Sequence, residues 1–133
     1  MLAQNKNSKK ILIIEDDSFI SEMYSMKFKS YGWQTFTAEN GQIGLEKIHQ
    51  IMPDLILLDI IMPQMDGFET LRSLRKDEVF KNTPVIILSN LGEKSDIEKG
   101  LSLGANDYIV KAYFTPQEVV KKIEKYLTVK NQH

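Results

Sequence analysis

The stretch that decides the fold is PDLILLDIIMPQMDG, residues Pro53 to Gly67. It contains an unbroken apolar run and places a single carboxylate, Asp59, where that run meets a polar turn. Burying an ionised carboxylate without a partner is costly, so Asp59 must either reach water or belong to a charged site. The rest of the sequence has to choose between these two possibilities.

The composition sets limits on what the protein can be. Its 133 residues are enough for one domain with its own core. The net charge of -1 gives no overall attraction to nucleic acid or to an anionic membrane, so we expect no direct contact with either. There is no cysteine for a disulfide or a thiolate metal site, which fits a cytoplasmic location. We expect no membrane span and no signal peptide.

The hydrophobic pattern predicts five strands, each followed by a helix. The expected strands are Lys10–Glu15, Trp33–Ala38, Asp54–Asp59, Pro84–Ser89 and Asp107–Val110. The expected helices are Phe19–Tyr31, a segment from Asn40-Gly41 to just before Pro53, Met65–Phe80, Glu93–Leu103 and Thr115–Leu127. Ser18 is the predicted N-cap of the first helix, and Thr115 with Glu118 predicts a capping box at the last. Residues 1–9 and 128–133 are predicted tails of a single domain, 10–127.

Strands joined through helices pair in parallel, which predicts an α/β fold. The first, third and fourth strands are continuous apolar runs and should be covered on both faces, whereas the second and fifth are more polar and fit edge positions. We therefore predict a doubly wound, flavodoxin-like (βα)5 fold. It is an open parallel sheet in the order 2-1-3-4-5, with helices on both faces. The chain is too short for a closed barrel of eight such units.

In such sheets the chemistry gathers at the carboxyl ends of the strands. There the third strand supplies Asp59, the fourth supplies Ser89, the fifth is followed by Lys111, and the first is followed by three carboxylates, Glu15, Asp16 and Asp17. Several carboxylates at one rim repel each other unless a proton or a cation intervenes. Oxygen ligands without histidine or cysteine favour Mg2+, which also accepts phosphate oxygens as ligands.

This set of residues predicts phosphoryl chemistry. A carboxylate such as Asp59, beside Mg2+, can attack a phosphoryl group and become an acyl phosphate. Ser89 would then donate a hydrogen bond to one phosphoryl oxygen, and Lys111 would supply a positive charge to another.

Four segments stand in order along the chain at the predicted strand ends: ILIIEDD (Ile11–Asp17), PDLILLDIIMPQMDG (Pro53–Gly67), PVIILSN (Pro84–Asn90) and GANDYIVK (Gly104–Lys111). Together they closely resemble the receiver domain of two-component response regulators, over about Lys10 to Leu127. The resemblance implies that Asp59 is the phosphoacceptor. It places Glu15 and Asp16 at the acidic pair, with Asp16 as direct metal ligand and Glu15 acting through water. It also places Ile61 where a backbone carbonyl completes the metal shell.

The resemblance also implies a switch. Ser89 stands at the switch hydroxyl position, Tyr108 at the switch aromatic and Lys111 at the family's lysine. A sensor histidine kinase or a histidine phosphotransfer protein would give its phosphoryl group to Asp59. Ser89 would move toward the phosphate, and Tyr108 would rotate inward and change a partner-binding face over the fourth helix, fifth strand and fifth helix. The chain is then a phosphorelay module acting on a downstream protein, and not an enzyme, although it assists its own transfer and hydrolysis.

Three features depart from the family pattern. Ala112 follows Lys111 where proline in a cis peptide is usual. A cis bond before a non-proline residue costs about 3 kcal/mol, so either the loop supports that cost or Lys111 approaches from a different backbone. Asn90 follows Ser89 where a small residue is usual, and it could narrow the phosphate's entrance or add a hydrogen bond. Third, most members of the family continue into a DNA-binding or enzymatic domain, whereas this sequence ends in KYLTVKNQH; if it is complete, as a single-domain regulator, it would act by docking onto another protein.

Two other functions fit this sequence less well, and a third stays open. A flavodoxin-type FMN carrier would need a hydroxyl- and glycine-rich loop after the first strand, where this chain has EDDSF. A phosphatase of the haloacid dehalogenase kind would need an acid two residues after the nucleophile, where Ile61 stands. The alternative that remains open is a receiver-like binding module that signals by protein contacts without phosphorylation.

Overall fold

The computed structural model describes residues 8–129 and contains a five-stranded parallel sheet in the order β2-β1-β3-β4-β5. The strands are β1 Lys10–Ile14, β2 Gln34–Ala38, β3 Leu55–Leu58, β4 Val85–Ser89 and β5 Asp107–Val110. The doubly wound α/β fold is confirmed, as are the edge positions of the second and fifth strands. Residues 1–7 and 130–133 of the predicted tails lie outside the described residues.

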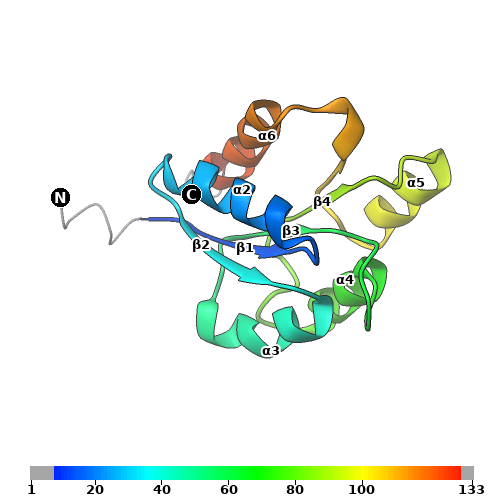
Figure 1. The fold of residues 1–133 in the computed structure, drawn as a ribbon. Helices are drawn as coiled ribbons and strands as arrows, with labels where there is room; N and C mark the ends of the chain where they lie inside the picture. The colour runs from blue at the N-terminus through cyan, green and yellow to red at the C-terminus, as the bar shows by residue number, and fades with distance from the viewer. Residues whose placement is uncertain (1–7, 130–133) are drawn as a thin grey trace.

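Helices cover both faces of the sheet. They are α2 Ser18–Lys29, α3 Gly41–Ile51, α4 Gly67–Lys76, α5 Lys94–Ser102 and α6 Pro116–Val129, with a 3-10 turn, η1, at Lys111–Tyr113. Figure 1 shows α2 and α6 above the sheet and α3 and α4 below it. Between residues 8 and 129, no helix has both the length and the apolar character needed to cross a bilayer.

The sheet divides the hydrophobic core into two layers. In β1, Leu12 and Ile14 belong to the layer that packs against α3, α4 and α5, whereas Ile11 and Ile13 belong to the layer under α2 and α6. The alternation follows from the two-residue period of a strand. Because both layers exclude water, the central strands need apolar side chains at every position, which explains their continuous hydrophobic runs.

The first helix after β1 begins one residue away from the prediction. Asp17, and not Ser18, is the N-cap of α2, because its Oδ1 accepts the backbone N–H groups of Phe19 at 2.9 Å and Ile20 at 3.2 Å. A carboxylate is a strong N-cap and also suits the positive end of the helix dipole. Asp17 therefore serves the helix end and is not part of the carboxylate cluster described below.

The start of α6 agrees with the prediction from the sequence, whereas the bounds of α4 differ from it. The capping box before α6 is confirmed, with Thr115 N donating to Glu118 Oε1 at 2.8 Å and Glu118 N donating to Thr115 Oγ1 at 3.1 Å. The predicted helix Met65–Phe80 was too long. Asp66 instead caps α4 at its start, and the backbone becomes extended at Asp77. Asp66-Gly67, a dipeptide that favours turns, is thus the beginning of α4.

Candidate functional site

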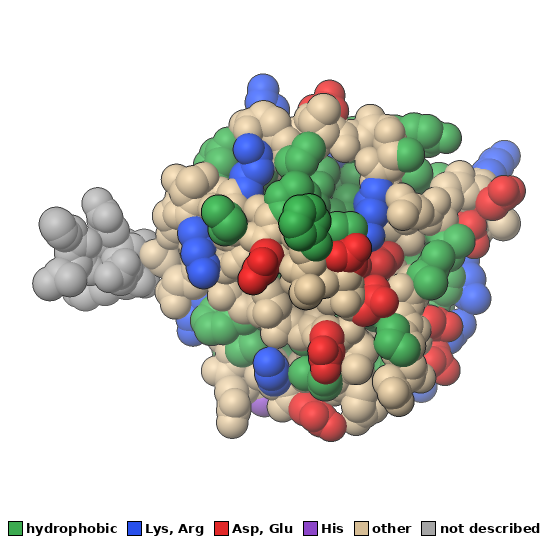
Figure 2. All heavy atoms as spheres, viewed as in Figure 1, with side chains coloured by type: hydrophobic (Ala, Val, Ile, Leu, Met, Phe, Trp, Pro, Cys, Tyr) green, Lys and Arg blue, Asp and Glu red, His purple; other side chains and the backbone are tan. Residues whose placement is uncertain are grey.

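The predicted carboxylates meet at the carboxyl ends of the strands. Because Ile14 pairs with Leu58 across β1 and β3, the residues that follow each strand lie side by side. Carboxylate oxygens of Glu15, Asp16 and Asp59 all lie within 4.8 Å of one another. Figure 2 shows acidic side chains gathered on this side of the molecule, next to a hydrophobic patch. Glu15 and Asp59 are 5% and 7% exposed, whereas Asp16 is open to solvent.

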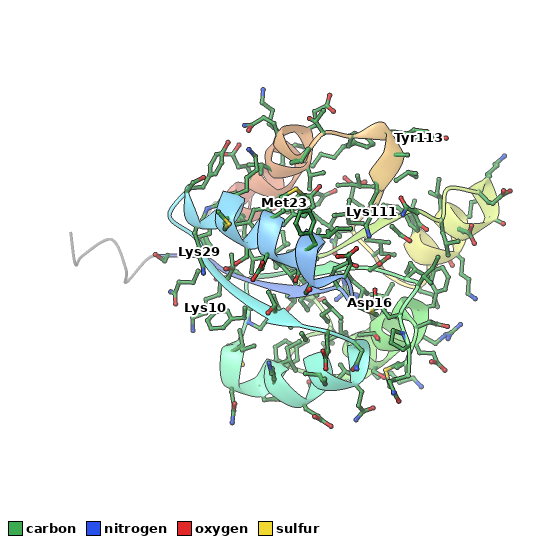
Figure 3. The ribbon with its side chains drawn as sticks, viewed as in Figure 1. Lys10, Asp16, Met23, Lys29, Lys111 and Tyr113 are labelled. Carbon is green, nitrogen blue, oxygen red and sulfur yellow. The ribbon has the colours of Figure 1, made fainter. Side chains whose placement is uncertain are left out.

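Lys111 brings a positive charge to this cluster. Its Nζ lies 2.9 Å from Glu15 Oε1 and 3.4 Å from Asp59 Oδ2, and Figure 3 shows it at the same end of the sheet as Asp16. No cis peptide bond occurs between residues 8 and 129, and Lys111 begins the 3-10 turn η1. The peptide bond between Lys111 and Ala112 is therefore trans, so Lys111 approaches from a different backbone and not through a cis peptide. Its ammonium still reaches both carboxylates.

Backbone N–H groups fix the two buried carboxylates. Asp59 Oδ1 accepts a hydrogen bond from Ile60 N at 2.7 Å, and Glu15 Oε2 accepts one from Asp17 N at 3.1 Å. Each buried carboxylate thus uses one oxygen on the backbone and turns the other toward Lys111. The backbone hydrogen bonds hold both carboxylates in fixed positions, as a preorganised site requires.

The charges perturb one another. Burial, followed by the charge of Asp59, raises the pKa of Glu15 from 4.5 to about 7, although Lys111 and the Asp17 N–H lower it in part. Burial alone would lower the pKa of Lys111, but its hydrogen bond to Glu15 and the charges of Asp59 and Glu15 raise it overall. The lysine therefore stays an ammonium, while Glu15 changes charge near neutral pH.

Ser89 and Tyr108 lie on neighbouring strands beside this cluster. Ser89 is fully buried at the end of β4, and its Oγ accepts the Leu91 N–H at 3.2 Å. Tyr108 is 9% exposed, and its hydroxyl donates to the Leu91 carbonyl at 2.7 Å. Burial raises the pKa of Tyr108 to about 12. The Tyr108 ring thus lies buried in this structure, and its rotation on phosphorylation stays a prediction. Asn90 is exposed, and its effect on the entrance for the phosphate also stays a prediction.

The donor set fits a hard divalent cation. Glu15, Asp16 and Asp59 offer only oxygen atoms, which suit Mg2+ better than softer metals. A hollow of about 280 Å³ opens beside Glu15 and Asp16, on the side away from Asp59, which does not line it. The cluster can therefore hold a metal ion. The carbonyl of Ile61 as a further ligand stays a prediction.

Two contributors to the site were not identified from the sequence. Gly67 N donates to the Ile60 carbonyl at 2.9 Å, and a Cβ at Gly67 would collide with the carbonyl oxygen of Asp59. The Asp66-Gly67 dipeptide gave a signal for the turn but none for this close approach. The second is the backbone of Leu91, which contacts both Ser89 and Tyr108, whereas the sequence had pointed only to the apolar side chain of Leu91. An apolar loop residue acting through its backbone gives no sequence signal.

Residues 11–124 match the family of the response regulator receiver domain, and the chain belongs to this family. Its fold and its acidic cluster are those of the phosphoacceptor module in two-component signalling.

Among its relatives, the phosphate regulon transcriptional regulatory protein PhoB of Pseudomonas aeruginosa is 39% identical over 119 residues. The match covers 90% of this chain and 52% of that protein. The probable transcriptional regulator ycf27 of Guillardia theta is 36% identical over 127 residues, 96% of this chain and 48% of that one. The chain therefore spans about half the length of these curated relatives.

Solved structures agree with this assignment. The receiver domain of the Francisella response regulator 1452 superposes with a TM-score of 0.86 at 33% identity, covering 93% of this chain and 100% of that one. The CheY-like receiver domain protein of Methanospirillum hungatei gives 0.87 at 27% identity, covering 95% and 98%.

Proposed function

We propose that Asp59 accepts a phosphoryl group from a phosphohistidine, carried by a sensor histidine kinase or a histidine phosphotransfer protein. The observation that supports this most directly is the meeting of Asp59 with Glu15, Asp16 and the Lys111 ammonium at one end of the sheet. Asp59 is the most enclosed of the site's aspartates, held by the Ile60 N–H and facing a cation. It is therefore the carboxylate positioned to act as nucleophile.

The reaction forms one bond and breaks one. A carboxylate oxygen of Asp59 bonds to phosphorus while the bond from phosphorus to the imidazole nitrogen breaks, and the histidine leaves with that electron pair. Lys111 stays protonated and places its charge beside one oxygen of the phosphoryl group. The Ser89 hydroxyl donates a hydrogen bond to another phosphoryl oxygen. Hydrolysis later returns Asp59 to a carboxylate and releases inorganic phosphate.

Mg2+ is the cofactor that we propose for this site. Glu15, Asp16 and Asp59, with the backbone carbonyl of Ile61, would hold it. When bound, the ion supplies positive charge to the phosphoryl oxygens. The residues themselves keep the carboxylates close together and Lys111 charged.

We place the phosphohistidine donor on α2. Phe19, Met23 and Met26 recur at helical spacing and are 82%, 38% and 72% exposed. Figure 2 shows the hydrophobic patch over α2 beside the acidic cluster. A helix of the donor protein can bury this stripe with its own apolar face and bring its phosphohistidine to Asp59. The downstream protein would use the surface over α5, β5 and α6, next to Tyr113 of η1, which is 74% exposed.

Intact mass measurement tests the reaction. The protein is incubated with acetyl phosphate and Mg2+, together with Asp59→Asn and, as a matched control, Asp77→Asn at the far end of α4. We expect wild type and Asp77→Asn to gain one phosphoryl group and Asp59→Asn to gain none. No adduct on any protein would instead support a module that signals by contacts alone.

The docking surface has its own test. Phe19→Ser should leave phosphorylation by acetyl phosphate unchanged, because the small donor does not touch α2. Transfer from a phosphorylated histidine kinase should become slower. Equal slowing with both donors would mean that Phe19 supports the fold of the site and does not contact the donor.

A further inference from the structure

Helix α5 places a glycine directly against strands β4 and β5, beside the packing that Ile97 of the same helix makes with the core. Gly100 is the buried residue of α5, and every other residue of this helix is exposed or partly exposed. A Cβ at Gly100 would lie 2.9 Å and 3.1 Å from Cδ2 and Cε2 of Tyr108, and 2.7 Å from Cδ1 of Ile87. Real side chains do not approach each other that closely. The absence of a side chain at Gly100 therefore makes the space in which the Tyr108 ring lies.

From this ring a chain of hydrogen bonds runs back toward the phosphoacceptor. The Tyr108 hydroxyl donates to the Leu91 carbonyl at 2.7 Å, and the Leu91 N–H donates to Ser89 Oγ at 3.2 Å. One loop residue is thus held at both of its backbone groups. The Ser89 side chain also forms a hydrogen bond with Tyr108, and its hydroxyl can turn from that partner to another acceptor. The proposed phosphoryl oxygen is such an acceptor.

We propose that Gly100 is a positioning residue for the reaction at Asp59. By leaving space for the Tyr108 ring, it keeps Leu91 in place and orients the Ser89 hydroxyl as a donor toward the phosphoryl group. The inference rests on the proposed function, because it names a residue that tunes phosphorylation of Asp59. It places control of the rate in a helix that contributes no side chain to the site.

A purely structural role predicts a different outcome. Alanine favours helix formation over glycine, so Gly100→Ala would raise the melting temperature and leave the reaction unchanged if only the helix mattered. If Gly100 makes space for Tyr108, the added methyl group displaces the ring, breaks the hydrogen bond to Leu91 and releases Ser89. The rate should then fall although helix propensity rises.

The test measures the initial rate of phosphorylation by acetyl phosphate with Mg2+. We expect Gly100→Ala to slow it by about three- to tenfold, the range that loss of one neutral hydrogen bond gives. Ser95→Ala, at an exposed position of the same helix, should react like wild type. In Tyr108→Ala the space beside Gly100 is empty, so adding Gly100→Ala to that variant should not change the rate of phosphorylation further. Equal rates for wild type and Gly100→Ala would overturn the proposal.

A second measurement does not depend on phosphorylation. In protein labelled with 3-fluorotyrosine, the resonance of Tyr108 is identified by its loss in Tyr108→Phe. Gly100→Ala should move it toward the position of exposed tyrosines, and a resonance that does not move would refute the proposed contact. If wild type takes no phosphoryl group, the proposed function fails, and the fluorine spectrum still decides whether Gly100 makes space for Tyr108.

Discussion

The stability of the metal-free protein should fall as pH rises, and Glu15→Gln should remove most of that fall. Glu15 is 5% exposed and lies beside Asp59, and burial with this charge raises its pKa from 4.5 to about 7. The folded protein therefore holds the proton more tightly than the unfolded chain does. Its contribution to stability is complete below about pH 4.5 and is lost as pH rises through about 7.

The size of the effect follows from the shift in pKa. Each pKa unit corresponds to about 1.4 kcal/mol, so ionising Glu15 costs about 3 kcal/mol more in the folded protein than in the unfolded chain. Glutamine has a similar shape and no charge, so Glu15→Gln should be more stable than wild type at pH 8. At pH 5, where Glu15 is mostly protonated in the folded state, the two proteins should differ little.

Urea denaturation with a chelator present, at pH 5 and pH 8, measures this difference. Glu22→Gln, at an exposed position of α2, controls for the loss of one negative charge. Wild type and Glu22→Gln should lose stability between the two pH values, and Glu15→Gln should lose much less. A pH dependence equally steep in Glu15→Gln would refute the reasoning. Mg2+ added at pH 8 should stabilise wild type strongly and Glu15→Gln weakly.

Three further predictions concern other residues. The phosphorylated protein should decay slowly, because the apolar side chains of Ile61 and Leu91 offer no hydrogen bond to orient an attacking water, and a half-life of seconds with Mg2+ would contradict this. Gly67→Ala should destabilise the protein by about 2 kcal/mol, measured by thermal unfolding, because the added methyl collides with the backbone of Asp59. Arg75→Met should cost about 3 kcal/mol in urea denaturation, because it removes the guanidinium donors that the carbonyl groups of Thr83 and Gly104 now have.

The fold could be predicted because hydrophobic pattern and connection length are properties of the sequence. The continuous apolar runs of β1, β3 and β4 reflect burial on both faces, and the helices between strands require parallel pairing. Once the strand order is known, the carboxyl-end rule brings Glu15 and Asp59 together without any further information.

Details that depend on local backbone angles could not be predicted. Asp17 and Ser18 are both good caps, and only the path of the chain after β1 decides between them. The backbone of Lys111 was open for the same reason, since Ala112 imposes no fixed angle. Leu91 contributes through its carbonyl and its N–H, which every residue has, so no side-chain signal marks it.

Asp59, the carboxylate at the end of an apolar strand, belongs to a site that has too little positive charge for its carboxylates. The three carboxylates lie close together and the ammonium of Lys111 pairs with two of them, so this ammonium leaves two negative charges uncompensated when all three are ionised. A proton on Glu15 removes one of them, and burial of Glu15, together with the charge of Asp59, raises its pKa and so favours that proton. A divalent cation would compensate both, and it requires that the proton leave. Proton and metal thus compete for the same deficit, which makes occupancy of the site sensitive to pH near neutrality.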